Sequence, residues 1–372
     1  MSEDMANPIL EFLALRAKTL SPLLILTHDH PDPDAMASAW ALAFLAERLH
    51  KIRTRIAYGG IIGRMENQMM VRILRVPVCH FSPQDLFHYK NVALVDTQPP
   101  FQNNRYPSYR EAAIIIDHHP KHPNTKGSLV LIDETSGATA TMLTEALMAA
   151  DLAIPPKLAT ALAYGIGSET QNLSREAGPR DVAAHAALLP RVNMRSLQHI
   201  QNPPRPGSFF LTLGRAIQNA FMLKNIIGVH LCQVDIPDIV SHMADFLLTH
   251  EKTRWSIVTG RYEGSLLVSL RTRNQDAGAG KLLWRLLGRK TSAGGHKMIA
   301  GGSIYVGENA DEQAWRRQEE KLLFAFLHAL GYSKTEELRY PYYAAGQPQA
   351  AAQASRQDIN GGSGNADNSS SL

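Results

Sequence analysis

The sequence predicts an α/β protein in which a domain built on a parallel sheet precedes a second, smaller α/β domain. In the first half, short apolar runs alternate with longer helical stretches, as βαβ units require. The apolar runs end abruptly in acids and histidines, and a Pro-Pro-Arg-Pro-Gly stretch at residues 203–207 interrupts the chain. These observations predict two domains, with ionisable groups gathered at the strand ends of the first.

Four apolar segments of the first half each lead into acids or histidines. Because the carboxyl ends of parallel strands meet at one edge of a sheet, we expect these groups at one site. Helices are expected at residues 36–49 and 139–150. The segments and clusters are 23–27 with His28-Asp29-His30-Pro31-Asp32-Pro33-Asp34, 92–95 with Asp96, 112–116 with Asp117-His118-His119, and 161–168 with Glu169.

The second half reads as a connection, a smaller domain and a tail. Strands are expected at residues 226–231 and 265–270, and a last helix at 311–330 ends before Gly331. The tail is rich in Ala, Gln, Ser, Gly and Asn, with little to bury, so we expect it to be disordered. The predicted segments are a catalytic metal-binding domain at 1–190, a linker at 191–224, a substrate-binding domain at 225–337 and a tail at 338–372.

The clusters have the composition of a metal site. Carboxylates mixed with imidazoles suit divalent Mn, Mg or Zn, because these ions accept oxygen and nitrogen ligands without any thiolate. With several acids and at least two imidazoles converging, a pair of ions is expected. Two ions about 4 Å apart can activate a water molecule and stabilise the leaving oxygen of a phosphoryl displacement.

The motifs resemble those of a known family. The pattern His28-x-x-x-Asp32-x-Asp34, then Asp96, then Asp117-His118-His119, then Gly165-Ile166, resembles the DHH phosphoesterase superfamily. Farther along, Gly294-Gly295-His296-Lys297-Met298-Ile299-Ala300-Gly301-Gly302 looks like the glycine-rich motif of the DHHA1 domain. The resemblance covers the chain except for roughly its last thirty residues. It implies a parallel-sheet DHH domain and a DHHA1 domain facing each other across a cleft.

The resemblance also implies roles for single residues. His28 and Asp32 match ligands of a first metal ion, while Asp34 and His118 match ligands of a second. Asp96 matches the carboxylate that bridges both ions. The resemblance favours Mn²⁺, with Mg²⁺ as the alternative.

Three further positions belong to the same implied centre. His119 corresponds to the contact with the substrate phosphate, and Asp117 would orient a neighbouring imidazole. The family motif Gly-Ile-x-x-Asp-Thr reads Gly-Ile-Gly-Ser-Glu-Thr here, so Glu169 stands in place of a metal-binding Asp.

In the second domain, the resemblance implies a substrate-binding surface. Backbone N–H groups at Gly294 and Gly295 would approach phosphate oxygens, with His296 as a side-chain donor. Arg271 and Arg273 resemble the family's substrate-binding arginine segment. The two arginines can point to opposite faces of a strand, so only one need bind. A tight turn is the alternative interpretation of the glycines.

Some neighbouring polar residues have simpler interpretations. Asp29 and His30 fit a solvated loop, and His122 fits a surface turn. Residues 133–136 would end a strand and cap a helix running from Gly137, with an oxygen from Thr135 or Ser136.

Composition limits the remaining possibilities. The chain has 372 residues, of which 44% are hydrophobic, enough for two cores. No apolar stretch approaches the roughly 20 residues of a membrane helix, and the acidic start is unlike a signal peptide, so we expect a cytoplasmic protein with two reduced cysteines. Its 38 basic and 34 acidic residues give a net charge of +4, which favours a short anionic substrate over a long nucleic acid.

The sequence therefore predicts a hydrolase of phosphoric esters that binds short RNA or nucleotides. Within the superfamily it is most similar to the nanoRNase and pAp-phosphatase branch, which implies exonuclease-like in-line water attack at two metal ions on short RNA or 3′-phosphoadenosine 5′-phosphate. Alternatives are a cyclic- or linear-dinucleotide phosphodiesterase, a RecJ-like single-strand exonuclease, and a nucleotide-binding protein impaired by Glu169. Family II pyrophosphatases use a different second domain, so the glycine-rich motif from Gly294 to Gly302 argues against that alternative. A homodimer is left open.

Overall fold

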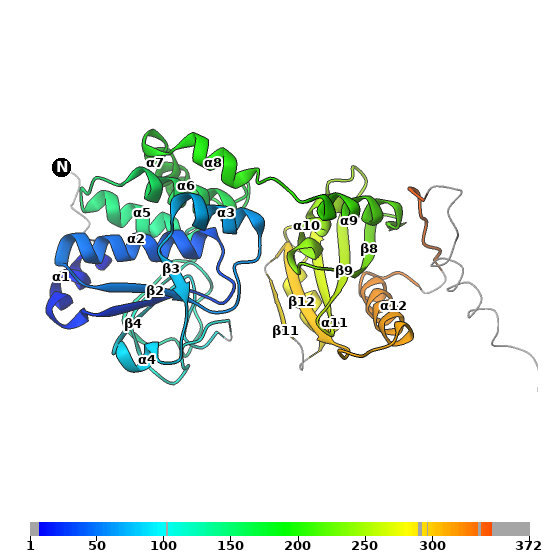
Figure 1. Cartoon of the computed structure of the whole chain (residues 1–372), viewed down its shortest axis with the longest axis horizontal. Helices are drawn as coiled ribbons and strands as arrows, with labels where there is room; N and C mark the ends of the chain where they lie inside the picture. Colours follow the sequence, from blue (N-terminus) through cyan, green and yellow to red (C-terminus); the bar gives the residue numbers. More distant parts are fainter. Residues whose placement is uncertain (1–6, 102, 289–291, 296, 334–335, 344–372) are drawn as a thin grey trace, which may run out of the picture. The chain divides into compact units, whose positions relative to one another are not determined.

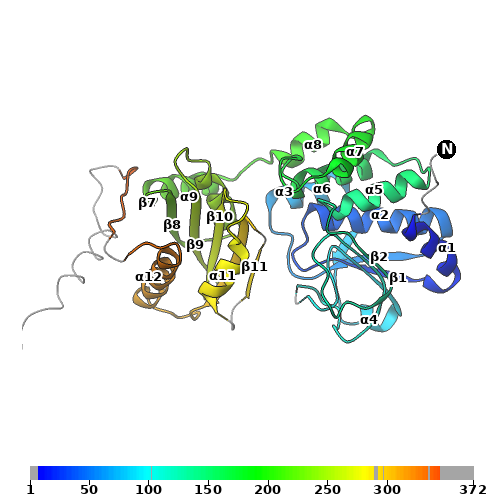
Figure 2. The same cartoon turned by 180° about the vertical axis from the view of Figure 1, so that it is seen from behind.

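The computed structural model describes residues 7–101, 103–288, 292–295, 297–333 and 336–343. The chain divides into two compact units, Met1–Pro204 and Arg205–Leu372, each built around one six-stranded sheet (Figure 1, Figure 2). No helix within these described ranges is long and apolar enough to cross a membrane.

The first unit contains an entirely parallel sheet in the order β3-β2-β1-β4-β5-β6. The chain builds outward from β1 to β3, then returns to place β4 on the other side of β1. Every residue of β1 is buried, as expected for a strand covered on both faces. The strands are β1 Leu23–Leu26, β2 Thr54–Tyr58, β3 Val78–His80, β4 Asn91–Val95, β5 Ala112–Asp117 and β6 Gly127–Ile132.

Helices cover this sheet and enclose a core on each face. The larger core joins the sheet to α1, α2, α5 and α6, and the smaller one includes Tyr106 and contacts Leu86 of α4. The helices expected at residues 36–49 and 139–150 are confirmed as α2 and α5. The helical segments are α1 Pro8–Leu20, α2 Pro33–His50, α3 Met65–Leu74, α4 Asp85–His88, α5 Thr139–Ala149, α6 Pro156–Glu169, α7 Pro179–Leu188, η1 Leu189–Arg191 and α8 Met194–Gln201.

The fourth apolar segment forms a helix, although the sequence predicted a strand. Residues 161–168 do not form a strand; they lie in helix α6, and Glu169 is its last residue. The first half of α6, Pro-Lys-Leu-Ala-Thr-Ala-Leu-Ala, favours a helix, and Pro156 stands in the first turn, where its missing N–H costs nothing. The close packing of Gly165 on α2 then fixes the rest of the segment as helix.

The start of α5 also differs from the sequence prediction. The helix begins at Thr139, and neither Thr135 nor Ser136 caps it. The Ser136 hydroxyl instead donates to the Ala138 carbonyl, and the Thr135 hydroxyl donates to Asp133. The first N–H groups of α5 are satisfied from another element, by a carboxylate of α2.

The second unit contains a mostly antiparallel sheet in the order β11-β12-β10-β9-β8-β7, in which β8 and β9 are parallel. Helices α9 and α10 pack on one face, and α11 and α12 pack on the other. This confirms a second α/β unit with strands at 226–231 and 265–270. Its elements are α9 Gly207–Gln218, β7 Phe221–Leu223, β8 Ile226–Gln233, α10 Asp238–Leu248, β9 Trp255–Tyr262, β10 Ser265–Thr272, α11 Ala279–Leu287, β11 Ser292–Gly295, β12 Ile299–Tyr305 and α12 Glu312–Ala329.

The segment between the two sheets differs from a simple linker. Residues 191–224 include α8, α9 and β7, and the boundary between the units falls after Pro204. The tail also begins later than expected, because Arg339 exchanges two backbone hydrogen bonds with Met222. The remaining tail, residues 344–372, lies outside the described residues.

A buried ion network joins the sheet of the second unit to its last helix. Arg261 of β9 donates to Glu319 of α12 over 2.8 and 3.0 Å, and the side chains of both residues are less than 10% exposed. Glu312 also accepts from Arg261 and is more exposed. The guanidinium lies over the ring of Trp315, with 5.5 Å to its centroid. The network fixes α12 to β9.

Candidate metal centre

The strand order of the first unit brings the predicted clusters together. β1 and β4 are neighbours although β2 and β3 separate them in sequence, so the order of connections reverses between them. Open α/β sheets place their ligands beyond the carboxyl ends of strands at such a reversal. Asp96 follows β4 at this point, and His28, Asp32 and Asp34 follow β1. Asp117 ends β5, the next strand along.

Asp96 lies between two imidazoles. Its Oδ2 is 3.6 Å from Nε2 of His28, and its Oδ1 is 3.6 Å from Nε2 of His118. The residue is buried and holds a left-handed backbone with φ of 60°, which is unfavourable for a non-glycine residue and occurs mainly where the surroundings enforce it. Thr139 donates its hydroxyl to Oδ1 over 2.8 Å. Each carboxylate oxygen therefore faces a different imidazole.

Two sets of side chains have the spacing of metal ligands. His28, Asp32 and Asp96 form one set, and Asp96, His118 and His119 form the other, with ligand atoms in each set within 4.8 Å of one another. Separations of 3.6–3.8 Å between these nitrogens and oxygens are too long for hydrogen bonds. They match two ligands of one ion, each bound at roughly 2.1 Å. Asp96 belongs to both sets.

The orientation of the imidazoles fits metal binding. Nδ1 of His28 lies 2.9 Å from the Asp29 carbonyl, and Nδ1 of His118 lies 3.3 Å from the Ser136 carbonyl. These contacts turn both Nε2 atoms toward the carboxylates, the usual arrangement of metal-binding histidines. Nε2 of His118 is buried and has no hydrogen-bond partner within the described part of the chain. The residues present therefore fit a pair of divalent ions.

Asp34 is held by the start of α5. Its two oxygens accept the backbone N–H groups of Thr139 and Ala140 over 2.8 and 2.7 Å. Oδ2 also lies 3.9 Å from Nε2 of His118, so Asp34 borders the second set of ligands. A carboxylate beside a helix N-terminus is stabilised by the helix dipole. Asp34 thus ties α2 to α5 at the centre.

The carboxylates crowd one another. Burial and the neighbouring charges of Asp96 and Asp32 raise the pKa of Asp34 well above its ordinary value. Burial and the charge of Asp32 likewise raise the pKa values of Asp96 and Glu169. Raised pKa values show that the ionised acids lack compensating positive charge. Divalent cations would supply that charge.

The pKa values of two histidines are raised as well, which favours their charged form. Burial disfavours a charged ring, but the nearby carboxylates of Asp32 and Asp96 outweigh it and raise the pKa of His28 to about 9. Burial also opposes protonation of His119, but the hydrogen bond to Asp117 and the charge of Asp96 raise its pKa to about 10. Nδ1 of His119 lies 2.8 Å from Asp117. Asp117 therefore fixes the orientation of the His119 ring.

Two residues of the centre escaped the sequence analysis. Thr139 contacts both Asp34 and Asp96. Gln98 is buried, and its side-chain amide donates to Asp117 over 2.8 Å. The oxygen of the same amide accepts the backbone N–H of His122. Gln98 follows Asp96 by two positions, and this proximity to a strand-end acid was the available signal.

The second-unit candidates lie in several environments. Arg271 is buried; its guanidinium donates to Asp245 over 2.5 Å and to the carbonyls of Leu270 and Ala300. A phosphate contact would require these partners to be exchanged. Arg273 is exposed and donates to the Leu248 carbonyl.

The glycine-rich motif is partly described. Gly294 and Gly295 are exposed in β11, and His296 lies outside the described residues. Gly295 has a φ of 148°, and an added Cβ would come within 2.2 Å of the Ile299 carbonyl oxygen, so this position requires glycine.

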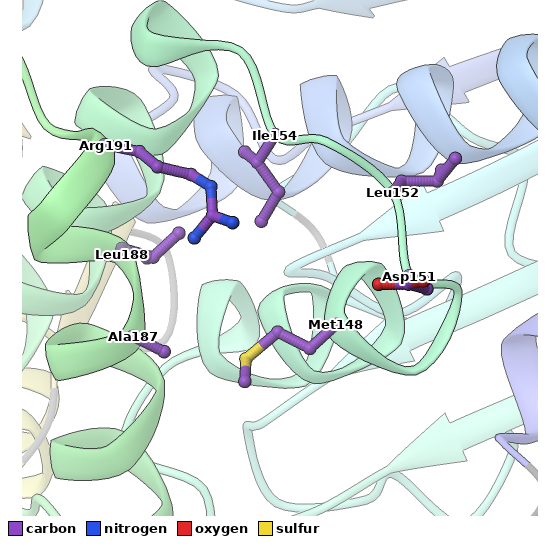
Figure 3. Close-up of a pocket in the computed structure, with 7 residues that line it drawn as sticks. All are labelled: Met148, Asp151, Leu152, Ile154, Ala187, Leu188 and Arg191. Carbon is purple, nitrogen blue, oxygen red and sulfur yellow. The ribbon is translucent and has the colours of Figure 1, made fainter.

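The remaining polar residues lie beside the centre or away from it. Asp29 pairs with Arg105, and His30 exchanges contacts with Ile61, so both stabilise the loop after β1. A separate cavity of about 200 Å³ is lined mainly by apolar side chains of α5, α7 and the loop between α5 and α6, with Arg191 and Asp151 at its sides (Figure 3). It contains none of the candidate ligands.

Comparisons with known proteins agree with this geometry. Residues 22–166 match the family model "DHH family, N-terminal domain". An uncharacterized protein of Methanocaldococcus jannaschii is 34% identical over 323 residues, which cover 85% of this chain and 66% of that relative. The chain thus spans slightly less than two thirds of the relative's length.

Two solved structures share the fold. An exopolyphosphatase-related protein from Bacteroides fragilis superposes with a TM-score of 0.68 at 13% identity, covering 87% of this chain and 98% of that chain. RecJ from Thermus thermophilus in complex with Mn²⁺ gives a TM-score of 0.51 at 15% identity, covering 88% and 55%. The family match falls on the segment that carries the His28, Asp96 and Asp117-His118-His119 motifs. Residues 22–166 of the chain therefore form a DHH-family N-terminal domain.

Proposed function

We propose that the chain is a metal-dependent phosphoesterase that hydrolyses short oligoribonucleotides, 3′-phosphoadenosine 5′-phosphate, or both. The observation that carries the proposal is Asp96, whose two oxygens each lie 3.6 Å from a different imidazole nitrogen. Such a shared carboxylate suits two ions that act on one phosphate. We propose Mn²⁺ as the working ion and the cytoplasm as its location.

The residues of the centre have different roles in the proposed reaction. Two bound divalent ions would lower the pKa of a water molecule and offset the negative charge that develops on phosphorus oxygens. Asp117 holds His119 in one orientation beside Asp96, where the protonated ring can contact a substrate phosphate. Thr139 restrains the shared carboxylate through its hydroxyl.

The similar structures support this chemistry. One is named as related to exopolyphosphatase, and the RecJ structure contains Mn²⁺. The nanoRNase and pAp-phosphatase branch is our proposal from the motifs, and Arg273 with Gly294 and Gly295 would contact the distal part of the substrate.

A substrate panel tests the proposal. Purified protein with Mn²⁺ should be offered 3′-phosphoadenosine 5′-phosphate, RNA dimers to pentamers, a cyclic dinucleotide and a long single strand. We expect hydrolysis of the first two kinds, abolished by EDTA and restored by Mn²⁺. Exclusive hydrolysis of the cyclic dinucleotide or the long strand would replace the proposed substrate. Metal-dependent turnover of any of them would exclude an impaired binding protein.

Substrate length should have a clear effect. With 38 basic against 34 acidic residues, the chain has little excess charge for a long cationic track. We expect turnover to fall steeply beyond about five nucleotides, a length near the lower end of single-module binding sites. Rates on RNA of increasing length, at low and moderate salt, measure this effect. Equal rates on a dimer and a long strand would favour a RecJ-like exonuclease.

Metal binding should depend on pH. Since the pKa of His28 without metal is about 9, its ring carries a proton at neutral pH that must leave before Nε2 can bind an ion. We therefore expect the apparent Mn²⁺ affinity to rise up to about tenfold per pH unit for each displaced proton, and to level off near the pKa. Calorimetric titrations from about pH 6 to 8, in buffers of different ionisation enthalpy, measure the released protons. A pH-independent affinity would contradict the assignment of His28 as a ligand.

A further inference from the structure

The segment that follows α6 folds back onto the end of this helix. Gln171, Asn172 and Leu173 are three consecutive residues in the left-handed region, with φ of 48°, 56° and 64°. Each costs roughly 1–2 kcal/mol for an L-amino acid, so other contacts must hold the turn. The N–H groups of Asn172 and Leu173 donate to Gly167 and to the Thr170 hydroxyl over 2.7 and 3.0 Å. The turn reverses the chain.

The reversal returns Arg175 to the last residue of α6. Its Nη2 donates to the backbone carbonyl of Glu169 over 2.8 Å and lies 3.7 Å from the Glu169 Oε1 atom. The Arg175 side chain is 11% exposed, and its Nε is buried without a hydrogen-bond partner in the described ranges. One guanidinium thus contacts both the backbone and the side chain of Glu169.

The fold directs Glu169 toward the metal centre. At Gly165, an added Cβ would lie 3.1 Å from the Pro33 carbonyl oxygen and 3.2 Å from Cα of Asp34, so α6 packs closely on the start of α2. Glu169 lies one turn later on the same helical face. Its carboxyl group interacts electrostatically with Asp32, His118 and Asp96.

Glu169 faces a repulsive surrounding without metal. Asp32 and Asp96 are like charges, while Arg175 and His118 oppose them. Glutamate has one more rotatable bond than the aspartate of the family motif, so its carboxylate has more ways to turn toward solvent. A restraint on that side chain is therefore needed if it is to serve the centre.

We propose that Arg175 is a positioning residue that holds the Glu169 carboxylate at the metal centre. The inference rests on the proposed function, because it treats Glu169 as a group that serves the bound ions. A guanidinium suits this role, since Nη2 donates to the Glu169 carbonyl while its charge lies 3.7 Å from the Glu169 carboxylate. Arg175 acts through Glu169 and does not itself contact the substrate.

A structural role makes different predictions. A basic side chain on the last carbonyls of a helix stabilises that helix end. If Arg175 only capped α6, its removal would lower the melting temperature and leave Mn²⁺ affinity unchanged. If it contacted substrate directly, its loss would add to the loss of Glu169.

A double-mutant cycle separates these roles. We expect Arg175→Met to weaken Mn²⁺ affinity about 10–100-fold, the usual effect of removing a group that orients a ligand. Glu169→Ala should also weaken affinity, and the double variant should be no weaker than Glu169→Ala alone. Affinity is measured by calorimetry and by electron paramagnetic resonance of Mn²⁺. Arg180→Met is the matched control, since Arg180 pairs with Glu145 and Asp133 instead, and it should keep wild-type affinity.

Each result has a definite meaning. Additive losses, or an unchanged affinity with a lower Tm, would overturn the role of Arg175. If Arg175→Met does not fold, Arg175→Lys carries the same cycle, because lysine keeps the charge but its nitrogen ends one bond short of Nη2. This variant should cause a smaller, still non-additive loss. Absence of Mn²⁺ binding to the wild-type protein would instead refute the proposed function.

Discussion

Replacing Asp96 by asparagine is expected to abolish turnover while the first unit stays folded. The amide is neutral and presents only one oxygen, so it cannot face two cations as the shared carboxylate does. We expect kcat/KM to fall by on the order of 10³, the upper range for losing one electrostatic stabiliser. Burial and like charges raise the Asp96 pKa, so its charged form destabilises the metal-free fold at neutral pH and the amide removes that cost.

The measurements are activity with Mn²⁺, the number of ions bound, and the melting temperature in EDTA. Asp29→Asn is the matched control, because Asp29 pairs with Arg105 in the adjacent loop and belongs to neither ligand set. Near wild-type activity of Asp96→Asn would reject the two-metal centre. A lower melting temperature in EDTA would show that Asp96 also stabilises the fold.

Arg261→Met is expected to destabilise the second unit by about 3–5 kcal/mol, because it leaves the Glu319 carboxylate buried without its cation. The methionine keeps most of the volume beside Trp315, so the effect measures lost charge compensation more than lost packing. Denaturant unfolding is followed by tryptophan fluorescence in a Trp40→Phe background, so that the remaining tryptophans, Trp255, Trp284 and Trp315, all report on this unit.

Two further variants isolate the ion pair. Arg316→Met removes an exposed arginine that also pairs with Glu312, and should change stability by less than about 1 kcal/mol. Arg261→Met combined with Glu319→Leu should recover most of the lost stability, since neither charge is then buried alone. If Arg261→Met were as mild as Arg316→Met, the network would not hold α12 to the sheet.

The strand-end acids could be predicted because their cause is local in sequence. Ile114, Ile115 and Ile116 favour a buried strand, and an acid directly after it must lie at the strand's carboxyl end. A parallel sheet then brings such ends together. The same reasoning located Asp96 and His28 without knowledge of the strand order.

Other features depend on contacts that the sequence does not reveal. Residues 161–168 are apolar, and helix and strand can both bury such a run, so only the packing of Gly165 on α2 settles the choice. Gln98 and Thr139 have ordinary side chains whose partners lie far away in sequence. Arg261 and Glu319 are 58 residues apart, and nothing local marks them as a buried pair.

The central place of β1 also affects how the protein matures during synthesis. β1 emerges from the ribosome before β2 and β4, the two strands that flank it, so its apolar residues must wait for both. His28 emerges early, Asp96 and His118 follow, and Thr139 comes after them. At typical elongation rates, the interval from residue 28 to residue 139 lasts on the order of ten seconds. During that time the nascent chain exposes β1 to chaperones and to misfolding. Glu169 ends α6 and emerges later still, so the metal centre can be completed only after α5 and α6 have both left the ribosome.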